Sequence, residues 1–310
     1  MEKLILADKD LSSYHFPEGV NFKQVTYKSI DAYLSDERVV AIAGSRAMAI
    51  KCAGADLPSL KLFQLTSAGF DGVPCEEYAK RGVAVANAGG VYSAPIAETV
   101  VFGILQMAKR LRKNPNKRRP KLTRGYSEIT ELMGKRALIL GAGNIGTAVA
   151  KRLSAFEMQI DGYDPYCPEK EPYGRILRDR GELLLHVGEY DYVVCTLPDN
   201  EQTRGSLEKE FFSAMKESAV IVNVGRRAVF NEDDFYAALK SKRIGGAVLD
   251  MFEKLPNPIT NRFRRLRNVI VWPGVSAISR ELNIRLKEHM YANIIAAIEE
   301  KEILNVINGV

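Results

Sequence analysis

Three glycines near the middle of the chain have the spacing of loops that hold phosphate groups. The run GAGNIG supplies five candidate residues for contact with a phosphate ligand, which are Gly141, Gly143, Asn144, Ile145 and Gly146. An apolar run typical of a strand precedes the loop, and helical periodicity follows it. The first glycine permits a tight turn, the second lets a pyrophosphate approach the backbone, and the third lets the helix pack on the strand. The first amides of the helix supply donors and a positive dipole end for phosphate.

An acidic residue follows this loop at the spacing that a dinucleotide site requires. The segment MQIDGYDPY, which contains the next predicted strand, carries Asp164 at its end, eighteen residues after Gly146. A carboxylate there accepts hydrogen bonds from the adenosine ribose and repels a 2′-phosphate, which favours NAD over NADP. Asp161 lies one pleat earlier and is interpreted as a strand residue. A glycine turn without any ligand is the structural alternative.

Other candidate residues follow the later strands, whose carboxyl ends border ligands in a doubly wound sheet. One group of candidates for contact with the cofactor consists of Thr196, Leu197, Pro198, Thr203, Val224 and Asp250. Leu197 and Pro198 form either an apolar wall for adenine or a simple strand exit, and Asp250 either accepts from the cofactor or caps a turn. Arg226 suits a substrate carboxylate, because its planar guanidinium can grip one with two hydrogen bonds.

The elements that must position these residues alternate between strands and helices along the whole chain. Alternation of this kind predicts an α/β fold with parallel sheets and right-handed crossovers. In the first hundred residues the predicted strands are Lys3–Ala7, Val39–Ala43, Lys61–Leu65 and Val83–Ala86. The second series is Arg136–Leu140, Met158–Gly162, Tyr192–Thr196, Ala219–Asn223, Gly246–Asp250 and Val269–Trp272. Helical patterns cover Ser29–Leu34, Pro74–Arg81, Ala94–Arg112 and Ser279–Lys301.

Length and composition are those of an ordinary globular protein. The chain has 310 residues, of which 46% are hydrophobic and 26% charged, and this length suggests two domains. We expect one domain over 1–98 and 286–310 and the other over 99–285. The four cysteines are scattered, so we expect reduced thiols in the cytoplasm and predict no metal site. No signal peptide and no membrane helix are predicted.

The order of the motifs resembles the D-isomer-specific 2-hydroxyacid dehydrogenases over nearly the whole chain. The matching runs are GAGNIG, YDP, LP with a later threonine, VNVGR, LDMFE, NVIVWPG, TSAGFDG and NAGGVYSAPIAET. The resemblance implies a flavodoxin-like substrate domain, a Rossmann NAD domain and an active site in the cleft between them. It also implies that Arg226 binds the substrate carboxylate, that backbone N–H groups near Ala68 and Gly69 share this task, and that Asp250 contacts the nicotinamide end. A small 2-hydroxy or 2-oxo acid as substrate and a homodimer are expected on the same basis.

Two positions depart from the family pattern, and both concern proton transfer. The family uses a histidine that exchanges the hydroxyl proton and a glutamate that pairs with it. The position expected for the glutamate is occupied by Leu255, and the position expected for the histidine by Gly274. A glutamate without its histidine would be an uncompensated charge in an apolar cleft. The absence of the histidine is therefore consistent with the absence of the glutamate.

The sequence therefore offers several candidates for the proton donor. The histidines of the chain, His15, His186 and His289, occupy no matching position. Tyr92 is the first candidate for a catalytic role besides Arg226, although a packing role at the head of a helix is an equal alternative. The other candidates are Lys254, Ser276 and a bound water. Arg227 also departs from the family pattern, either for a more acidic substrate or as a side chain that points to solvent.

The positive charge of the chain is concentrated in one segment. Nine of the sixteen residues in Lys109–Arg124 are Lys or Arg, against a net charge of +6 for the whole chain. A solvated connector or subunit-contact loop is preferred over a phosphate or nucleic-acid contact, because no aromatic residue is interleaved. The functions considered, in order of preference, are an NAD-dependent oxidoreductase with a substituted proton donor, a catalytically silent NAD-binding sensor or interaction protein, and a dedicated nucleic-acid binder.

Overall fold

The chain forms two α/β units, each built on a sheet of parallel strands. The computed structural model describes residues 2–110, 129–250 and 262–310. One unit comprises Met1–Tyr92 with Ser279–Val310, and the other comprises Ser93–Ile278. The long C-terminal helix therefore belongs to the unit that the N-terminal strands form. In the parts of the chain that the structure describes, no helix combines the length and apolarity that a membrane span requires.

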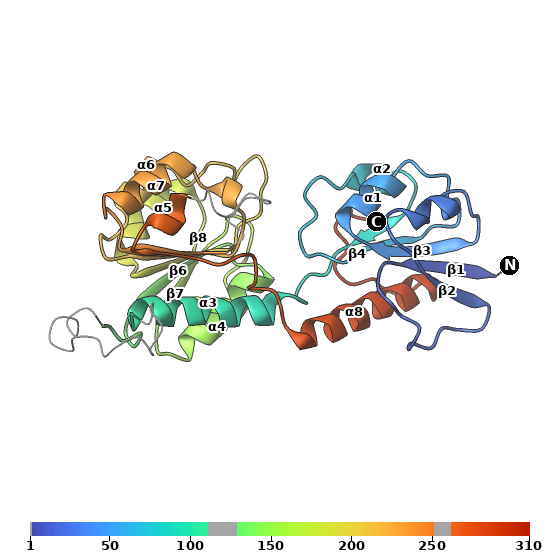
Figure 1. Cartoon of the computed structure of the whole chain (residues 1–310), viewed down its shortest axis with the longest axis horizontal. Helices are drawn as coiled ribbons and strands as arrows, with labels where there is room; N and C mark the ends of the chain where they lie inside the picture. The colour runs from blue at the N-terminus through green and yellow to red at the C-terminus, as the bar shows by residue number, and fades with distance from the viewer. Residues whose placement is uncertain (1, 111–128, 251–261) are drawn as a thin grey trace. The chain divides into compact units, whose positions relative to one another are not determined.

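The first unit has a five-stranded sheet in the order β2-β1-β3-β4-β5, and all its pairings are parallel. Its strands are β1 (Lys3–Ala7), β2 (Val20–Gln24), β3 (Val39–Gly44), β4 (Leu62–Leu65) and β5 (Ala84–Ala86). Its helices are α1 (Arg46–Cys52), α2 (Cys75–Ala79) and α8 (Arg280–Ile298), together with the 3₁₀ turn η1 (Ser29–Tyr33). Helices α1 and α2 cover one face of this sheet and α8 covers the other (Figure 1).

The second unit has a seven-stranded parallel sheet in the order β12-β11-β10-β9-β6-β7-β8. Its strands are β6 (Arg136–Leu140), β7 (Gln159–Tyr163), β8 (Ile176–Leu177), β9 (Tyr192–Cys195), β10 (Val220–Asn223), β11 (Gly246–Leu249) and β12 (Val269–Val271). Its α-helices are α3 (Ser93–Ala108), α4 (Asn144–Ser154), α5 (Arg180–His186), α6 (Lys209–Ala214) and α7 (Glu232–Lys240). Three 3₁₀ turns complete it: η3 (Val187–Glu189), η4 (Arg227–Val229) and η6 (Arg262–Arg265).

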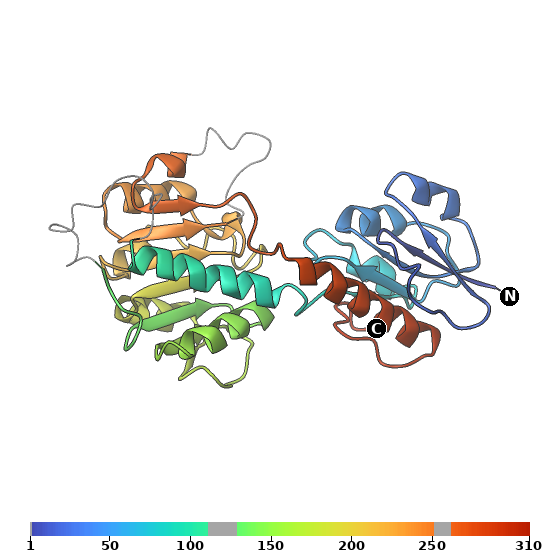
Figure 2. The ribbon, with the colours of Figure 1, turned by 60° about the horizontal axis from the view of Figure 1, so that its bottom comes forward.

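Helices lie on both faces of the second sheet, which is the doubly wound arrangement. Helices α3 and α4 lie side by side on one face, and α5, α6 and α7 lie on the other (Figures 1 and 2). The central strands β6, β9 and β10 are almost wholly buried, because their apolar side chains project from both faces of the sheet. The predicted α/β class with parallel sheets is confirmed.

Two strands were absent from the predicted series, and both lie at sheet edges. Strand β2 has only partly buried and exposed positions, and β8 consists of two residues. Strand β2 lacks the continuous apolar run that marks a strand buried on both faces, and β8, although both its residues are buried, is too short to show a pattern. The helix predicted over Ser29–Leu34 is also wrong in type, since the segment Ser29–Tyr33 forms a 3₁₀ turn.

Candidate cofactor and substrate sites

The glycine loop joins β6 to α4 at the carboxyl edge of the second sheet. Gly141 has a backbone φ of +95°, which side-chain-bearing residues rarely adopt. A Cβ on Gly146 would lie 2.0 Å from the carbonyl oxygen of Gly141, so only glycine lets the helix approach the turn this closely. Thr196 supports the same turn, since its hydroxyl lies 3.0 Å from the carbonyl oxygens of both Leu140 and Gly141.

Gly143 differs from its two neighbours in the motif, because space around it is open. A Cβ added there would meet no protein atom within 4 Å, and both Gly143 and Asn144 are exposed. Helix α4 begins directly after this glycine, so the amides of its first turn lack intrahelical acceptors. Open space beside unpaired amides at a helix start fits the diphosphate of a dinucleotide.

Asp164 follows β7 and contacts the glycine loop directly. Its Oδ2 accepts a hydrogen bond of 3.0 Å from the amide of Ala142. Its Oδ1 accepts from the amides of Tyr166 and Cys167 at 3.0 and 3.1 Å. The carboxylate is therefore held at the edge of the loop by backbone donors, with acceptor capacity left on Oδ2 for a ribose hydroxyl.

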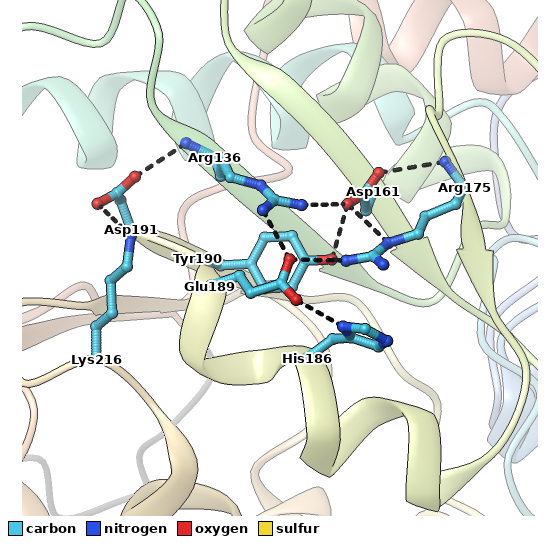
Figure 3. Close-up of polar contacts among 8 residues, drawn as sticks. All are labelled: Arg136, Asp161, Arg175, His186, Glu189, Tyr190, Asp191 and Lys216. Atoms are coloured by element: carbon cyan, nitrogen blue, oxygen red, sulfur yellow. Dashed lines mark hydrogen bonds and ion pairs between the residues drawn. The ribbon is translucent and has the colours of Figure 1, made fainter.

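Asp161 has a different environment from Asp164. It lies within β7, is 7% exposed, and takes part in a cluster with Arg136, Arg175, Glu189 and Tyr190, which we call the Asp161 cluster (Figure 3). Its Oδ2 contacts both guanidinium groups at 3.2 Å and accepts from the Tyr190 hydroxyl at 2.8 Å. Arg136 begins β6, so the cluster lies toward the amino end of the strands, away from the glycine loop.

The residues after β9 divide between the core and the surface. Leu197 is 8% exposed and packs in the main core of the second unit, whereas Pro198 is exposed. The Thr203 hydroxyl donates to the carbonyl of Pro198 at 2.6 Å, which closes the intervening loop. The buried position of Leu197 assigns it to strand packing, and Pro198 is the one that remains open to a ligand.

The end of β10 and the turn after it place the side chains of Asn223 and Arg226 at the carboxyl edge of the sheet. Arg226 follows this turn and is half-buried, and Val224 before it is buried. Arg227 pairs through its Nε with Glu232 at 2.6 Å, so its charge serves an ion pair within the unit. Asn223 is fully buried, and its Nδ2 has no hydrogen-bond partner among the described residues. Sequence reasoning missed Asn223, although a polar residue that ends the apolar run AVIVN was a usable signal.

Asp250 follows β11 and organises the turn after β12. Its Oδ1 accepts from the amides of Gly274 and Val275 at 2.8 and 3.0 Å. Its Oδ2 accepts from the amide of Ser276 at 3.1 Å and also from the hydroxyl of Ser276. A carboxylate has about four acceptor positions, and these four donors use them. Asp250 thus holds the segment in which Gly274, with a φ of +74°, occupies the position expected for histidine.

In the first unit, the loop after β4 turns its carbonyl groups inward. The carbonyl oxygens of residues 66 to 69 accept hydrogen bonds from Tyr92, the amide of Ala88, Asn87 and Ser67, respectively. The amides of Ala68 and Gly69 have no acceptor among the described residues. Successive unpaired N–H groups of this kind form a concavity that attracts anions, which fits a carboxylate.

Tyr92 is half-buried and contributes to this loop through its hydroxyl. The hydroxyl donates a hydrogen bond to the carbonyl of Thr66. Burial, and after it the negative charge of Asp8, raises the pKa of Tyr92 above its ordinary value. A tyrosine in this state holds its proton firmly and directs it at a backbone carbonyl.

The imidazole rings of two of the three histidines have polar partners within their own units, and the backbone carbonyl of His15 accepts from the hydroxyl of Tyr291. His186 pairs with Glu189 of the Asp161 cluster at 2.6 Å, and His289 contacts the carbonyl of Asn87 at 2.9 Å. The other candidate positions that sequence analysis named, Leu255, Lys254 and most of Lys109–Arg124, lie outside the described residues.

Comparison with known proteins agrees with the fold and with the glycine loop. Residues 101–276 match the family model for the NAD-binding domain of D-isomer specific 2-hydroxyacid dehydrogenases. A D-3-phosphoglycerate dehydrogenase of Archaeoglobus fulgidus is 28% identical over 81% of this chain, but the matched region covers 47% of that protein. The chain thus spans about half the length of this relative. A glyoxylate reductase of Korarchaeum cryptofilum is 30% identical, with 77% of this chain and 73% of that protein covered.

A solved structure shows the same fold over nearly the whole chain. The NADPH-dependent glyoxylate/hydroxypyruvate reductase of Sinorhizobium meliloti, crystallised with NADP and malonate, superposes with a TM-score of 0.76 at 22% identity. The match covers 99% of this chain and 97% of that protein. The match to the family model and the relative at 30% identity show that the chain belongs to the D-isomer specific 2-hydroxyacid dehydrogenase family.

Proposed function

We propose that this protein is an NAD-dependent oxidoreductase that interconverts a small 2-oxo acid and the corresponding 2-hydroxy acid. The observation that carries the proposal is the arrangement at Gly143. Open space, the unpaired amides that begin α4 and the Asp164 carboxylate all border the same loop. Relatives in the family are named D-3-phosphoglycerate dehydrogenase and glyoxylate reductase, which supports the assignment.

Each proposed ligand group has a stated partner in the chain. The first amides of α4 hold the diphosphate, and Asp164 holds the adenosine ribose and favours NAD over NADP. Arg226 and the amides of Ala68 and Gly69 bind the substrate carboxylate. When bound, the nicotinamide supplies or accepts the hydride, while the protein supplies orientation, charge stabilisation and the proton.

A second candidate function is a catalytically silent NAD-binding protein on the same fold. The φ of +74° at Gly274 favours this alternative, since the backbone there is built for glycine and not for the family histidine. The Asp250 carboxylate also favours the silent protein, because donors from residues 274–276 already occupy its acceptor positions. Arg226, which lies half-buried after the turn that follows β10, favours the enzyme, because a silent protein has less need of a group that binds a substrate carboxylate.

One experiment separates the two functions. NADH and NADPH binding is first measured by fluorescence titration of the purified protein. Oxidation of the bound coenzyme is then followed with a panel of 2-oxo acids, including glyoxylate and hydroxypyruvate, at several pH values. Turnover that Arg226→Ala removes and Arg226→Lys partly retains supports the enzyme. Binding without turnover for every acid supports the silent protein, and no binding of either coenzyme rejects both.

We propose a homodimer as the assembly, on the basis of the family resemblance. Sedimentation equilibrium tests this directly, because a monomeric mass at micromolar concentration contradicts it.

A further inference from the structure

The backbone of Ala142, the second residue of the glycine loop, is held on two sides by residues that follow β7. Its amide donates to the Asp164 carboxylate at 3.0 Å. Its carbonyl oxygen accepts a hydrogen bond of 2.6 Å from the Nζ of Lys170 and contacts the Sγ of Cys167 at 3.6 Å. A carboxylate and an ammonium group therefore meet the backbone of the same loop residue, and all of these contacts lie within the second unit.

The ammonium group of Lys170 has donors left for a ligand. It carries three N–H donors, and the hydrogen bond to Ala142 uses one of them. Lys170 is half-buried, and among the residues that the structure describes its charge enters no ion pair. Lysine binds phosphate oxygens through charge-assisted hydrogen bonds, and its flexible stem lets the ammonium group follow the anion. Lys170 is thus a cation that can bind a phosphate at the edge of the glycine loop.

A neighbouring cation, Arg178, is committed to the fold instead. Its Nη2 contacts the Glu169 carboxylate at 3.0 Å. Its Nη1 donates to the carbonyl of Asp164 at 3.3 Å and also to the carbonyl of Cys167. Arg178 therefore fixes the turn that carries Asp164, and its charge, unlike that of Lys170, is balanced by a carboxylate of the same segment.

The charges of Asp164 and Lys170 bear on the choice between the two pyridine coenzymes. NADP differs from NAD by a phosphate on the 2′ oxygen of the adenosine ribose, which is the sugar proposed to contact Asp164. The carboxylate repels this phosphate, whereas a cation nearby supplies the partner that the phosphate requires. Asp164 and Lys170 contact the same loop residue and act on the phosphate in opposite directions.

We propose that Lys170 is a specificity-determining residue of the coenzyme site, which binds the 2′-phosphate of NADP(H) and thereby limits the preference for NAD(H) that Asp164 sets. This inference rests on the proposed function. The protein then accepts both coenzymes, with NAD(H) bound more tightly. The alternative role for Lys170 is to brace the Ala142 carbonyl only, which would affect both coenzymes equally.

The test uses the full chain and two adenosine fragments, 2′,5′-ADP and 5′-AMP, which differ only by the 2′-phosphate. Calorimetric titration gives the Kd of each fragment, and fluorescence titration gives the Kd of NADPH and of NADH. Lys170→Met keeps a long apolar stem and removes the charge. It should raise the Kd of NADPH and of 2′,5′-ADP by about tenfold more than the Kd of NADH and of 5′-AMP. Lys170→Arg should keep most of the wild-type affinity for the 2′-phosphate.

A double variant separates phosphate binding from support of the loop. Asp164→Ala alone should shift the preference toward NADPH, and the addition of Lys170→Met should remove about tenfold of that shift. Lys151→Met is the matched control, because Lys151 is exposed in the last turn of α4, far along the helix from the glycine loop. It should match wild type for all four ligands. Thermal melts show whether each variant is folded.

The outcomes distinguish this inference from the proposed function. Losses of equal size for all four ligands in Lys170→Met would mean that Lys170 only braces Ala142, and they would overturn its role in specificity. Wild type that binds NADH but neither NADPH nor 2′,5′-ADP overturns that role as well. In both cases the proposed function stands. Wild type that binds neither coenzyme overturns the proposed function together with this inference.

Discussion

The carboxylate of Asp250 accepts a hydrogen bond of 2.8 Å from the backbone amide of Gly274. This contact joins the end of β11 to the turn after β12, where the family places its histidine. Val275 and Ser276 donate to the same carboxylate, and the residue is only 1% exposed. The turn is therefore built around one buried anion and three consecutive amides.

The first prediction concerns this buried anion. Asp250→Asn replaces one acceptor oxygen by an NH₂ group that faces the amide and hydroxyl of Ser276. Unfolding free energy should fall by about 2–4 kcal/mol, because buried donors lose a charged acceptor. Ser276→Ala removes only the hydroxyl donor and should cost about 1 kcal/mol. Urea denaturation of both variants measures this, and equal losses would contradict the dominant role of the amides.

The second prediction concerns the backbone at Gly274. Its φ of +74° lies in the left-handed region, where an L side chain costs about 1–2 kcal/mol. Gly274→Ala and Gly274→His should both be less stable than wild type by about this amount. Gly274→His should also fail to raise turnover, since the histidine arrives on a backbone shaped for glycine. A tenfold or larger gain in kcat for Gly274→His would show that this turn accommodates the family histidine.

The third prediction separates the two roles of glycine in the cofactor loop. Gly146→Ala places a methyl group against the Gly141 carbonyl, so it should lower both stability and NADH affinity. Gly143→Ala meets no protein atom and should leave the melting temperature nearly unchanged. It should still weaken NADH binding by about tenfold or more, because the methyl group occupies the space proposed for diphosphate. Unchanged affinity in Gly143→Ala would place the ligand elsewhere.

The fourth prediction concerns the choice of coenzyme. Asp164→Ala removes the carboxylate that faces the proposed ribose and that also anchors the Ala142 amide. NADH affinity should fall and NADPH affinity should rise, so the ratio of the two dissociation constants should shift by about tenfold toward NADPH. Asp161→Asn is the informative comparison, since it should lower stability through the Asp161 cluster without changing that ratio.

The fifth prediction concerns pH and the Asp161 cluster. The hydrogen bond with His186 has the largest effect and lowers the pKa of Glu189. Burial has the next largest effect and raises it, and the charges of Arg136 and Arg175 each lower it by less. A carboxylate with a lowered folded-state pKa stabilises the fold above its unfolded value of 4.5, and this contribution is lost as pH falls through the folded value. Glu189→Gln should therefore be less stable than wild type at pH 7.

Urea denaturation from pH 7 down to pH 3 checks the sign. The difference between wild type and Glu189→Gln should shrink as pH falls below 4.5. Glu217→Gln, an exposed change outside the cluster, should show no such trend. A difference that stays constant across the range would mean that the effect of Glu189 comes from packing and not from charge.

Particular patterns in the sequence determined much of the fold and the location of the cofactor loop. Strand Arg136–Leu140 was predicted with its exact bounds, because a buried parallel strand requires a continuous apolar run and a glycine turn ends it sharply. The glycine spacing and the acid at Asp164 are local features, so the sequence pattern alone predicts them. Edge strands β2 and β8 were not predicted, since their pairing depends on a neighbouring strand and not on their own residue pattern.

Tertiary structure alone decided what the polar residues contact. Asp161 and Asp164 are three positions apart, yet one joins an ion-pair cluster and the other faces the glycine loop. The pairing of Asp250 with residues 274–276 and the hydrogen bond from the amide of Asp8 to the carbonyl of Ala43 join segments that are distant in sequence. Hydrogen bonding and desolvation depend on distances in space, and only the folded chain sets these distances.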